Sequence, residues 1–498
     1  MIKIVYLPLD ERPCNRKFPP ALFESGEMHI CTPERLGDKK TPASHQEVES
    51  FLRRECAGAD GLIVSFETLL YGGLIPSRLH TLDKAELLRR LSLLRELRAV
   101  NPGLRIFGFS CIMRCPTYSS SDEEPDYYET WGAELHQLGA ARHRAALGGD
   151  GAEAAALEAR IPPEVTADYL TRRALNLELN LAVLELASDG TLDFLCIPQD
   201  DSAPLGFTAM DQGRVRRSVR EKRLQSKVLI YPGADELGLT LLSRMRNTLA
   251  DRVPAVYVHY AATGAPMVVP PFEDRPLGES VRYQLTAAGC RAAASPETAD
   301  FILAVTAPGQ NIAEASVQPR ADLDYDVGRS LPAFFAELRY WLDAGKPVSI
   351  CDNAYCNGGD LELLDLLDAG GRLMDLAGYA GWNTSANTMG TAIAQGVRYL
   401  YEGADQRHDD FLVLRYLEDC GYDSVVRQSV TRDKLPPLGL DYFHAGECGG
   451  EAARLVEQGL REFIARSLPS IASRIRLDGV RLPWKRMFEV DLDVRFIR

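Results

Sequence analysis

Two adjacent aspartates are the residues of this chain whose types and spacing most clearly allow chemistry. Asp200 and Asp201 directly follow the apolar run "DFLCIPQ" (193–199) and precede a turn of small residues, "SAPLG". Two neighbouring carboxylates disfavour double ionisation, so one of them tends to keep a proton near neutral pH. Cleavage of a glycosidic bond needs such a proton donor beside a charged partner. The pair therefore indicates acid–base catalysis of the glycosidase type.

Strand and helix patterns alternate around this pair. Helical patterns such as 84–100 place Leu87, Leu91, Leu94 and Leu97 on one face. Continuous apolar runs suit strands covered on both faces, as in parallel sheets. We expect an α/β fold, a (β/α)8-type barrel with insertions rather than a Rossmann unit, because no G-x-G-x-x-G follows an early strand; a doubly wound sheet is the alternative. The apolar runs predict strands at 2–8, 61–67, 104–112, 193–199, 227–233, 255–261, 300–306, 347–353 and 373–380.

The expected catalytic domain is this barrel-like part, residues 1–400. Within it, 113–190 predicts an insertion over the active face, and 254–350 indicates an α/β subdomain. Residues 401–498 predict a smaller C-terminal extension of helices and a β-ribbon, because the polarity of the last segment alternates.

Polar residues follow nearly every predicted strand. In a parallel barrel these strand ends share one rim, so we expect the residues to converge on one cleft. For a single position, an N-cap or a turn explains a polar residue equally well. The predicted catalytic residues are Asp200, Asp201 and Glu236. The predicted substrate-binding residues are Asp10, Arg12, Glu67, Arg114, Asp235, Tyr260, Asp352, Asn353, Asp360, Trp382, Asn383 and Asn387.

Other chemistries fit the same acidic rim. A two-carboxylate glycosidase would use Asp201 with Glu236 or Glu67. A metal-dependent hydrolase or lyase would use oxygen ligands, while the histidines lack zinc-site spacing, so we predict neither a metal ligand set nor a cofactor. A non-catalytic sugar-binding protein is a third class. Arg12, Arg78 and Arg114 predict structural ion pairs, with binding of an acidic substrate as the alternative.

Composition narrows the partners. The formal net charge of −14 argues against a nucleic-acid partner and against an anionic membrane surface. The start "MIKIVYLP" predicts a first strand rather than a signal peptide, and no run is long enough for a transmembrane helix. Eleven cysteines without a C-x-x-C pair predict free thiols in a reducing cytoplasm. We expect a cytoplasmic enzyme whose partner is a small carbohydrate or glycoconjugate; the sequence leaves a homo-oligomer open.

Five motifs resemble those of an uncharacterised bacterial family, domain of unknown function 4127. They are "YLPLDERPCN", "ETLLYGGLIPSR", "PQDDSAPLG", "GADELGLTLLSR" and "GWNTSANTMGTA". The resemblance spans nearly the whole chain and implies no established activity.

Three motifs are also similar to those of the family 84 glycoside hydrolases, the O-GlcNAcase-like β-N-acetylglucosaminidases. They are "PQDDSAPLG", "CDNAYCNGGD" and "NTSANTMGTA", although Cys351 stands where that family has tryptophan. The resemblance implies a (β/α)8 barrel in which Asp200 orients a substrate 2-acetamido group and Asp201 is the general acid and then the base. It also implies that Asn353 binds the acetamido group or a neighbouring hydroxyl and that Asp360 binds sugar hydroxyls. These roles predict an N-acetylamino-sugar substrate.

Overall fold

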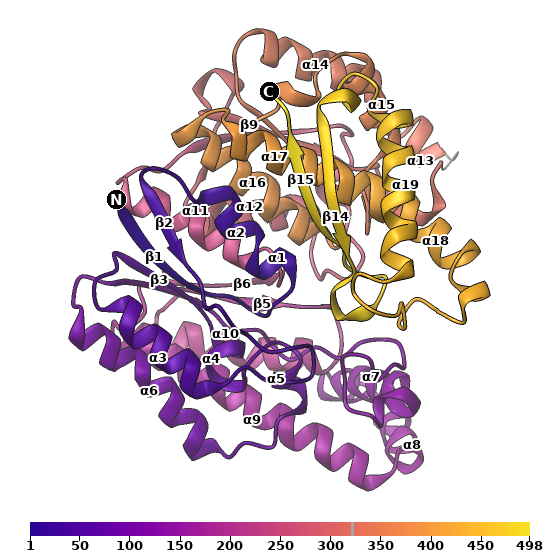
Figure 1. Cartoon of the computed structure of the whole chain (residues 1–498). Coiled ribbons are helices and arrows are strands. Elements are labelled where there is room, and N and C mark those ends of the chain that lie inside the picture. The colour runs from indigo at the N-terminus through magenta and orange to yellow at the C-terminus, as the bar shows by residue number, and fades with distance from the viewer. Residues whose placement is uncertain (320–322) are drawn as a thin grey trace. The chain divides into compact units, whose positions relative to one another are not determined.

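The chain divides into two compact units, each built on its own parallel sheet. The structure, a computed structural model, describes residues 1–319 and 323–498 (Figure 1). The first unit comprises Met1–Glu11, Gly26–Gly238 and Phe272–Asp274. The second unit comprises Arg12–Ser25, Leu239–Pro271 and Arg275–Arg498.

The first unit contains a six-stranded parallel sheet with the strand order β2-β1-β3-β4-β5-β6. The helices α3 (His45–Cys56), α6 (Lys84–Val100) and α9 (Pro163–Ser188) lie along one face of this sheet (Figure 1). Because all six strands are parallel, their carboxyl ends lie at the same end of the sheet. The strands are β1 (Ile2–Leu7), β2 (Met28–Cys31), β3 (Gly61–Ser65), β4 (Arg105–Phe109), β5 (Phe194–Gln199) and β6 (Val228–Pro232).

The second unit repeats this topology without a recognisable sequence repeat. Its five strands are parallel in the order β13-β11-β9-β7-β8. In chain order, both sheets place their first strand between the second and the third, which is the doubly wound order of flavodoxin-like folds. The strands are β7 (Ala255–Tyr260), β8 (Arg291–Ala292), β9 (Phe301–Thr306), β11 (Val348–Asp352) and β13 (Gly378–Ala380).

The predicted (β/α)8 barrel is not formed. Among the described residues, β2 pairs only with β1 and β6 only with β5, so the first sheet stays open at both edges. The edge strands β13 and β8 leave the second sheet open in the same way. Strands and helices alternate along the chain both in barrels and in doubly wound sheets. The alternation therefore predicted the α/β class correctly, but it could not distinguish a closed barrel from an open sheet. All nine predicted strands are present, and the short strands β2, β8, β10 (Ala313–Glu314) and β12 (Tyr355–Cys356) were missed.

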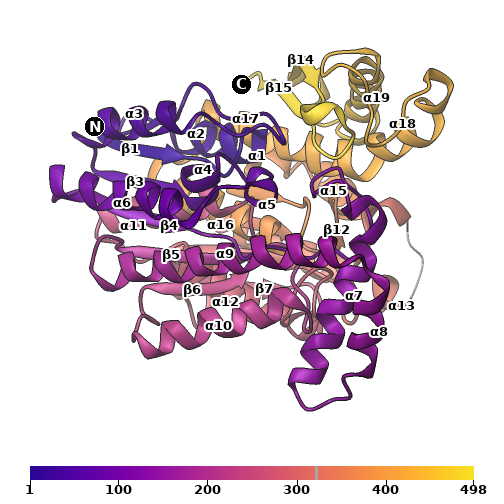
Figure 2. The ribbon, with the colours of Figure 1, turned by 90° about the horizontal axis from the view of Figure 1, so that it is seen from below.

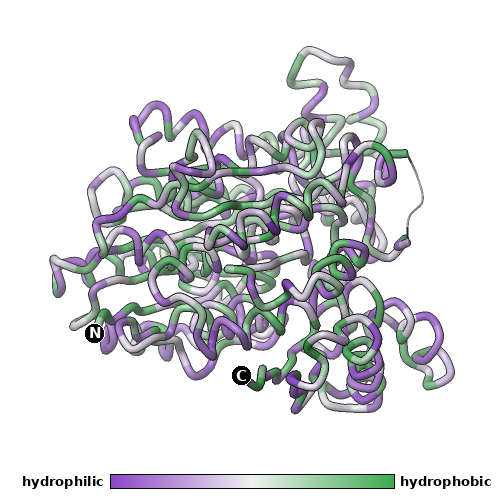
Figure 3. Tube along the Cα trace, turned by 90° about the horizontal axis from the view of Figure 1, so that it is seen from above, coloured by the Kyte–Doolittle hydropathy of each residue, from purple (hydrophilic) through white to green (hydrophobic). Residues whose placement is uncertain are grey.

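Local sequence explains why the core helix α6 forms where predicted. Asp83 caps it by accepting a hydrogen bond from the Glu86 backbone N–H at 2.8 Å, a favourable N-terminal arrangement. Its predicted apolar face is buried, with Leu87 and Leu94 fully inaccessible to solvent. In Figure 3, hydrophobic residues (green) recur along the extended stretches of the chain, and hydrophilic residues (purple) recur in the loops and coils around them. Burial of the apolar side chains stabilises the sheet, and the sheet determines where the polar residues that follow each strand lie.

Residues 113–190 form a helical excursion between β4 and β5. The helices α7 (Tyr128–Ala146) and α8 (Ala152–Arg160) lie side by side and precede the long helix α9 (Figure 2). A small separate core that includes Tyr128, Tyr169 and Phe207 supports this excursion. The excursion begins after β4 and ends before β5, and these two strands are neighbours in the sheet. Its first loop therefore starts close to the carboxyl end of β5, which Asp200 and Asp201 follow.

Residues 401–498 belong to the second unit. The helix α17 (Gln406–Arg415) continues into a π-helix, Tyr416–Val426. The predicted ribbon is confirmed, because β14 (Ile475–Arg481) and β15 (Asp491–Phe496) pair antiparallel. All eleven cysteines are free thiols, as predicted. Within the described residues, no helix combines the length and the apolar character that crossing a bilayer requires.

Candidate active site

The carboxyl ends of three neighbouring strands bring the acid pair together with its partners. β3 runs into α4 (Phe66–Tyr71), where the Ser65 side chain caps the helix by accepting from the Thr68 N–H and places Glu67 in the first turn. β4 is followed by Cys111 and Arg114, and β5 by Asp200 and Asp201. Because β3, β4 and β5 are adjacent in the sheet, these side chains meet at one edge.

Both aspartates turn toward the same guanidinium group. Arg114 Nη1 lies 3.1 Å from Asp201 Oδ2 and 3.6 Å from Asp200 Oδ2, and Arg78 Nη2 lies 3.0 Å from Asp200 Oδ2. Successive strand residues would point to opposite faces, but Asp201 has a φ of 48°, a left-handed conformation that aspartate tolerates. The aspartate side chains keep 21% and 23% of their surface exposed, whereas the arginines are buried. The two aspartates are therefore partly exposed to solvent, while the two arginines that they contact are buried.

Two further acids complete this cluster. Arg114 Nε lies 2.8 Å from Glu124 Oε1, and Arg114 Nη2 lies 2.8 Å from Glu123 Oε2. Arg78 Nη1 contacts the same two glutamates at 3.2 and 3.0 Å. Four carboxylates thus surround two guanidinium groups, and the predicted structural ion pairs of these arginines are confirmed. Glu123 and Glu124 lie in the loop before α7 and were missed, although "SDEEPDYY" marks that loop as acidic.

This excess of negative charge favours a shared proton. Burial and the neighbouring Asp200 raise the pKa of Asp201 from 3.8 to about 6, against the opposing effect of Arg114 and Arg78. At pH 7 about a tenth of Asp201 is therefore protonated, and about half is protonated at pH 6, while Arg78 and Arg114 contact the Asp200 carboxylate. The arrangement matches a carboxyl group whose surroundings raise its pKa toward neutrality.

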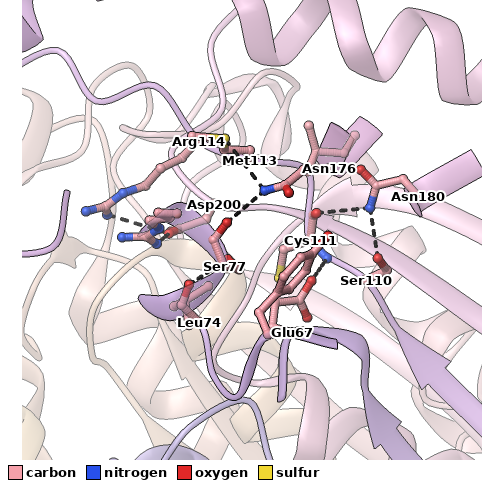
Figure 4. A pocket seen from close by; sticks show the side chains of 13 residues that line it. Glu67, Leu74, Ser77, Ser110, Cys111, Met113, Arg114, Asn176, Asn180 and Asp200 are labelled. Atoms are coloured by element: carbon pink, nitrogen blue, oxygen red, sulfur yellow. Dashed lines mark hydrogen bonds and ion pairs between the residues drawn. The ribbon is translucent and has the colours of Figure 1, made fainter. Parts of the chain in front are cut away.

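A small cavity lies beside Asp200 (Figure 4). Its volume is about 20 Å³, which is room for about one water molecule and far less than a sugar ring needs. A ligand as large as a sugar would therefore have to contact the aspartates from their exposed side. The cavity is lined by Glu67, Tyr71, Leu74, Ser77, Arg78, Ser110, Cys111, Ile112, Met113, Arg114, Asn176, Asn180 and Asp200.

Glu67 is the second acid of this cavity. It is 3% exposed, and burial raises its pKa from 4.5 to about 7, although two hydrogen-bond donors favour its charged form. Its Oε1 accepts from the Cys111 N–H at 2.7 Å, and its Oε2 accepts from Ser65 Oγ at 3.2 Å. Glu67 thus changes protonation state near neutrality beside a water-sized space.

Helix α9 closes the opposite wall with two asparagines that the sequence did not single out. Asn180 Nδ2 donates to Ser110 Oγ at 2.8 Å and to the Cys111 carbonyl at 3.1 Å. Asn176 Nδ2 donates to the Ser77 carbonyl at 2.8 Å (Figure 4). They occupy neighbouring turns of α9, so their spacing of four residues was the available signal.

Three predicted residues of the first unit lie at other strand ends. Asp10 follows β1, and Asp235 and Glu236 follow β6; all three are buried. Glu236 Oε2 accepts a hydrogen bond from the Ala234 N–H at 2.9 Å, so Glu236 stabilises the turn that follows β6. None of the three lines the cavity beside Asp200.

The other predicted residues belong to the second unit, so no rim of one closed barrel joins them to the acid pair: the polar strand ends follow two open sheets. Arg12 contacts Glu489 at 3.5 Å and lies over the Trp484 ring. Asn353 Nδ2 donates to the Ser385 carbonyl, and Trp382 Nε1 donates to Thr391 Oγ1. Tyr260 ends β7, Asn383 precedes α16 (Ser385–Glu402), and Asn387 lies in the first turn of that helix.

Asp352 is the centre of a buried network in the second unit. It accepts hydrogen bonds from Thr306 Oγ1 at 2.6 Å, from the Tyr379 hydroxyl at 2.6 Å and from the Asp360 N–H at 2.7 Å. Burial and the neighbouring Asp360 raise the pKa of Asp352 to about 6, and Asp360 pairs with Arg329. Asp352 is fully buried, so it ties the ends of β9, β11 and β13 together rather than facing a substrate.

The fold and the site define a doubly wound α/β protein with an acid–arginine cluster at the carboxyl ends of its first sheet. The chain belongs to the family described as "Protein of unknown function (DUF4127)", whose model matches residues 4–493. A comparison with curated proteins finds no match. Within the described residues, no group of three or more His, Cys, Asp and Glu side chains is arranged to hold a metal ion.

Proposed function

We propose that the first unit carries a glycoside hydrolase site and acts on an N-acetylamino-sugar conjugate. The observation that carries this proposal is the position of Asp200 and Asp201 on one buried guanidinium group, with the pKa of Asp201 raised to about 6. A protonated acid beside a charged, exposed carboxylate is the pair that glycosidic cleavage needs. The eleven free thiols support a reducing, cytoplasmic location for the enzyme.

In the proposed reaction, Asp201 donates its proton to the glycosidic oxygen as the bond to the anomeric carbon breaks. The carbonyl oxygen of the substrate 2-acetamido group attacks that carbon and forms a cyclic intermediate, while Asp200 accepts a hydrogen bond from the acetamido N–H. Asp201, now charged, then takes a proton from the water that opens the ring. Arg114 contacts both carboxylates and stabilises the charge that moves onto Asp201.

A second glycosidase mechanism uses Glu67 in place of the acetamido group. Glu67 and Asp200 line the same water-sized cavity, and the pKa of Glu67 is raised to about 7. A charged Glu67 would remove a proton from a water molecule held there, while Asp201 protonates the leaving group. This mechanism requires no 2-acetamido group, so the substrate separates the two schemes.

The test is hydrolysis of 4-nitrophenyl 2-acetamido-2-deoxyhexosides and of the matching 2-hydroxy glycosides. Each is measured with the wild type, Asp200→Asn, Asp201→Asn and Glu67→Gln; the control is Asp126→Asn, a fully exposed acid of the insertion. We expect turnover of the acetamido substrates alone and losses of about 100-fold or more in both aspartate variants. Equal turnover of 2-hydroxy substrates, abolished by Glu67→Gln, would replace the acetamido scheme with the Glu67 scheme. Wild-type rates in both aspartate variants would overturn the proposal.

A further inference from the structure

Three consecutive backbone N–H groups of the second unit converge on one carboxylate. The loop that follows β9 donates to Asp324 from Gly309 at 2.9 Å, from Gln310 at 3.1 and 3.2 Å and from Asn311 at 2.7 Å. Successive N–H groups that point into one concavity form the anion-binding nest found in phosphate sites. A side chain of the chain itself thus occupies a cradle suited to an oxyanion.

The position of this loop in the sheet supports a ligand site. The strand order of the second sheet reverses between β7 and β9, and open α/β sheets bind ligands outside the carboxyl ends of the strands at such a point. A Cβ at Gly264, in the loop after β7, would lie 2.5 Å from the Gly309 carbonyl oxygen, so the two loops meet backbone to backbone. A Cβ at Gly328 would lie 2.8 Å from Asp324 Oδ1. Glycines therefore keep the space around the carboxylate free of side chains.

The segment that carries Asp324 has anchors of its own. In the short helix α13 (Leu323–Asp326), the Tyr325 hydroxyl donates to the Ala354 carbonyl at 2.6 Å and accepts from the Ala313 N–H at 3.0 Å. Further along, the Ser330 N–H donates to the Ala261 carbonyl. Removal of the Asp324 side chain therefore leaves the segment in place and opens the cradle.

We propose that Gly309–Asn311 forms an oxyanion site in the second unit, which takes the phosphate or carboxylate group of a small ligand in exchange for Asp324. This site is independent of the acid pair of the first unit. The tethered carboxylate competes at an effective concentration on the order of millimolar or more, so it weakens binding in the wild type. The ligand displaces the Asp324 side chain from this loop, while the hydrogen bonds of Tyr325 keep α13 in place.

The experiment compares the full-length wild type with Asp324→Ala and Asp324→Asn. Asp326→Ala is the matched control, because Asp326 is an exposed acid on the same short helix. Each protein is titrated with inorganic phosphate, and separately with acetate, at an ionic strength held constant with chloride. The readouts are the amide ¹⁵N resonances of Gly309, Gln310 and Asn311 and the thermal midpoint.

We expect Asp324→Ala to bind phosphate or acetate at least about tenfold more tightly than the wild type or Asp326→Ala, because the internal competitor is gone. The shifts should concentrate on the three amides, and the added anion should raise the thermal midpoint of this variant alone. A response to phosphate but not to acetate assigns a phosphoryl ligand, and the reverse assigns a carboxylate. Equal responses in all proteins, or folded Asp324 variants without shifts at these amides, would overturn the proposal.

Discussion

The raised pKa of Glu67 predicts a pH-dependent stability that one substitution should remove. Glu67 is 3% exposed, and burial raises its pKa from 4.5 to about 7. The folded state therefore holds the proton more tightly than the unfolded state does. The stabilisation is complete below pH 4.5 and is lost as the pH rises through about 7. A difference of one in pKa between the folded and unfolded states corresponds to about 1.4 kcal/mol. The rise from 4.5 to about 7 therefore means that about 3 kcal/mol of unfolding free energy is lost.

Glu67→Gln should abolish this dependence, because glutamine has the shape of the protonated acid. Its amide oxygen still accepts from the Cys111 N–H, and its Nε2 donates to Ser65 Oγ in place of the present bond. We expect wild type and variant to have similar unfolding free energies at pH 4.5, and the variant to be more stable by about 3 kcal/mol at pH 8.

The assay is urea unfolding followed by circular dichroism at intervals between pH 4.5 and 8.5. The quantity compared is the difference in unfolding free energy between the variant and the wild type, which cancels the titration of the other groups. Glu221→Gln, an exposed acid on α10 (Phe207–Glu221), is the control and should show no such trend. A Glu67→Gln difference that stays constant across this range would show that burial does not raise the pKa of Glu67.

Three further predictions follow from the same structure. Ser65→Ala removes both the cap of α4 and a donor to Glu67, so it should cost about 1 kcal/mol of unfolding free energy and raise the pKa of Glu67 further, seen as a later midpoint of the pH dependence. Leu94→Ala in α6 should cost about 2–5 kcal/mol in urea unfolding, because Leu94 is fully buried, and the exposed Leu88→Ala should cost far less. Glycosidase activity should survive exhaustive chelation, since the proposed steps use only carboxylates and the substrate; activity that is lost on chelation and restored by Mg²⁺ would favour a metal-dependent hydrolase or lyase instead.

The elements of the fold could be predicted from the sequence more fully than their arrangement. Apolar runs such as 193–199 are local signals, and each of the nine predicted strands is present. The order of strands depends on which crossover reverses direction. In the first unit the reversal occurs at β1, which lies between β2 and β3 in the sheet. The local pattern of apolar and polar residues does not predict this reversal. β2 has only four residues, which is too short to stand out as an apolar run.

The acid pair could be predicted because chemistry and position coincide at the end of β5. Its partners were harder to find, because Glu123 and Glu124 reach the arginines from a loop, far from any strand end. The predicted convergence of the other strand ends depended on one closed rim. Asp352 and Asp360 instead belong to the second unit, where they form a buried network with Arg329 and Tyr379.

The raised pKa of Asp201 can be measured by a pH titration of the aspartate carboxyl carbons by ¹³C NMR, in the wild type, Asp201→Asn and Asp200→Asn. The signal that disappears in Asp201→Asn identifies Asp201. We expect this signal to titrate near pH 6 in the wild type and at a lower pH in Asp200→Asn, because the charge of Asp200 raises the pKa of its neighbour. An Asp201 signal that titrates near pH 4 in both proteins would contradict the shared-proton pair on which the proposed catalysis depends.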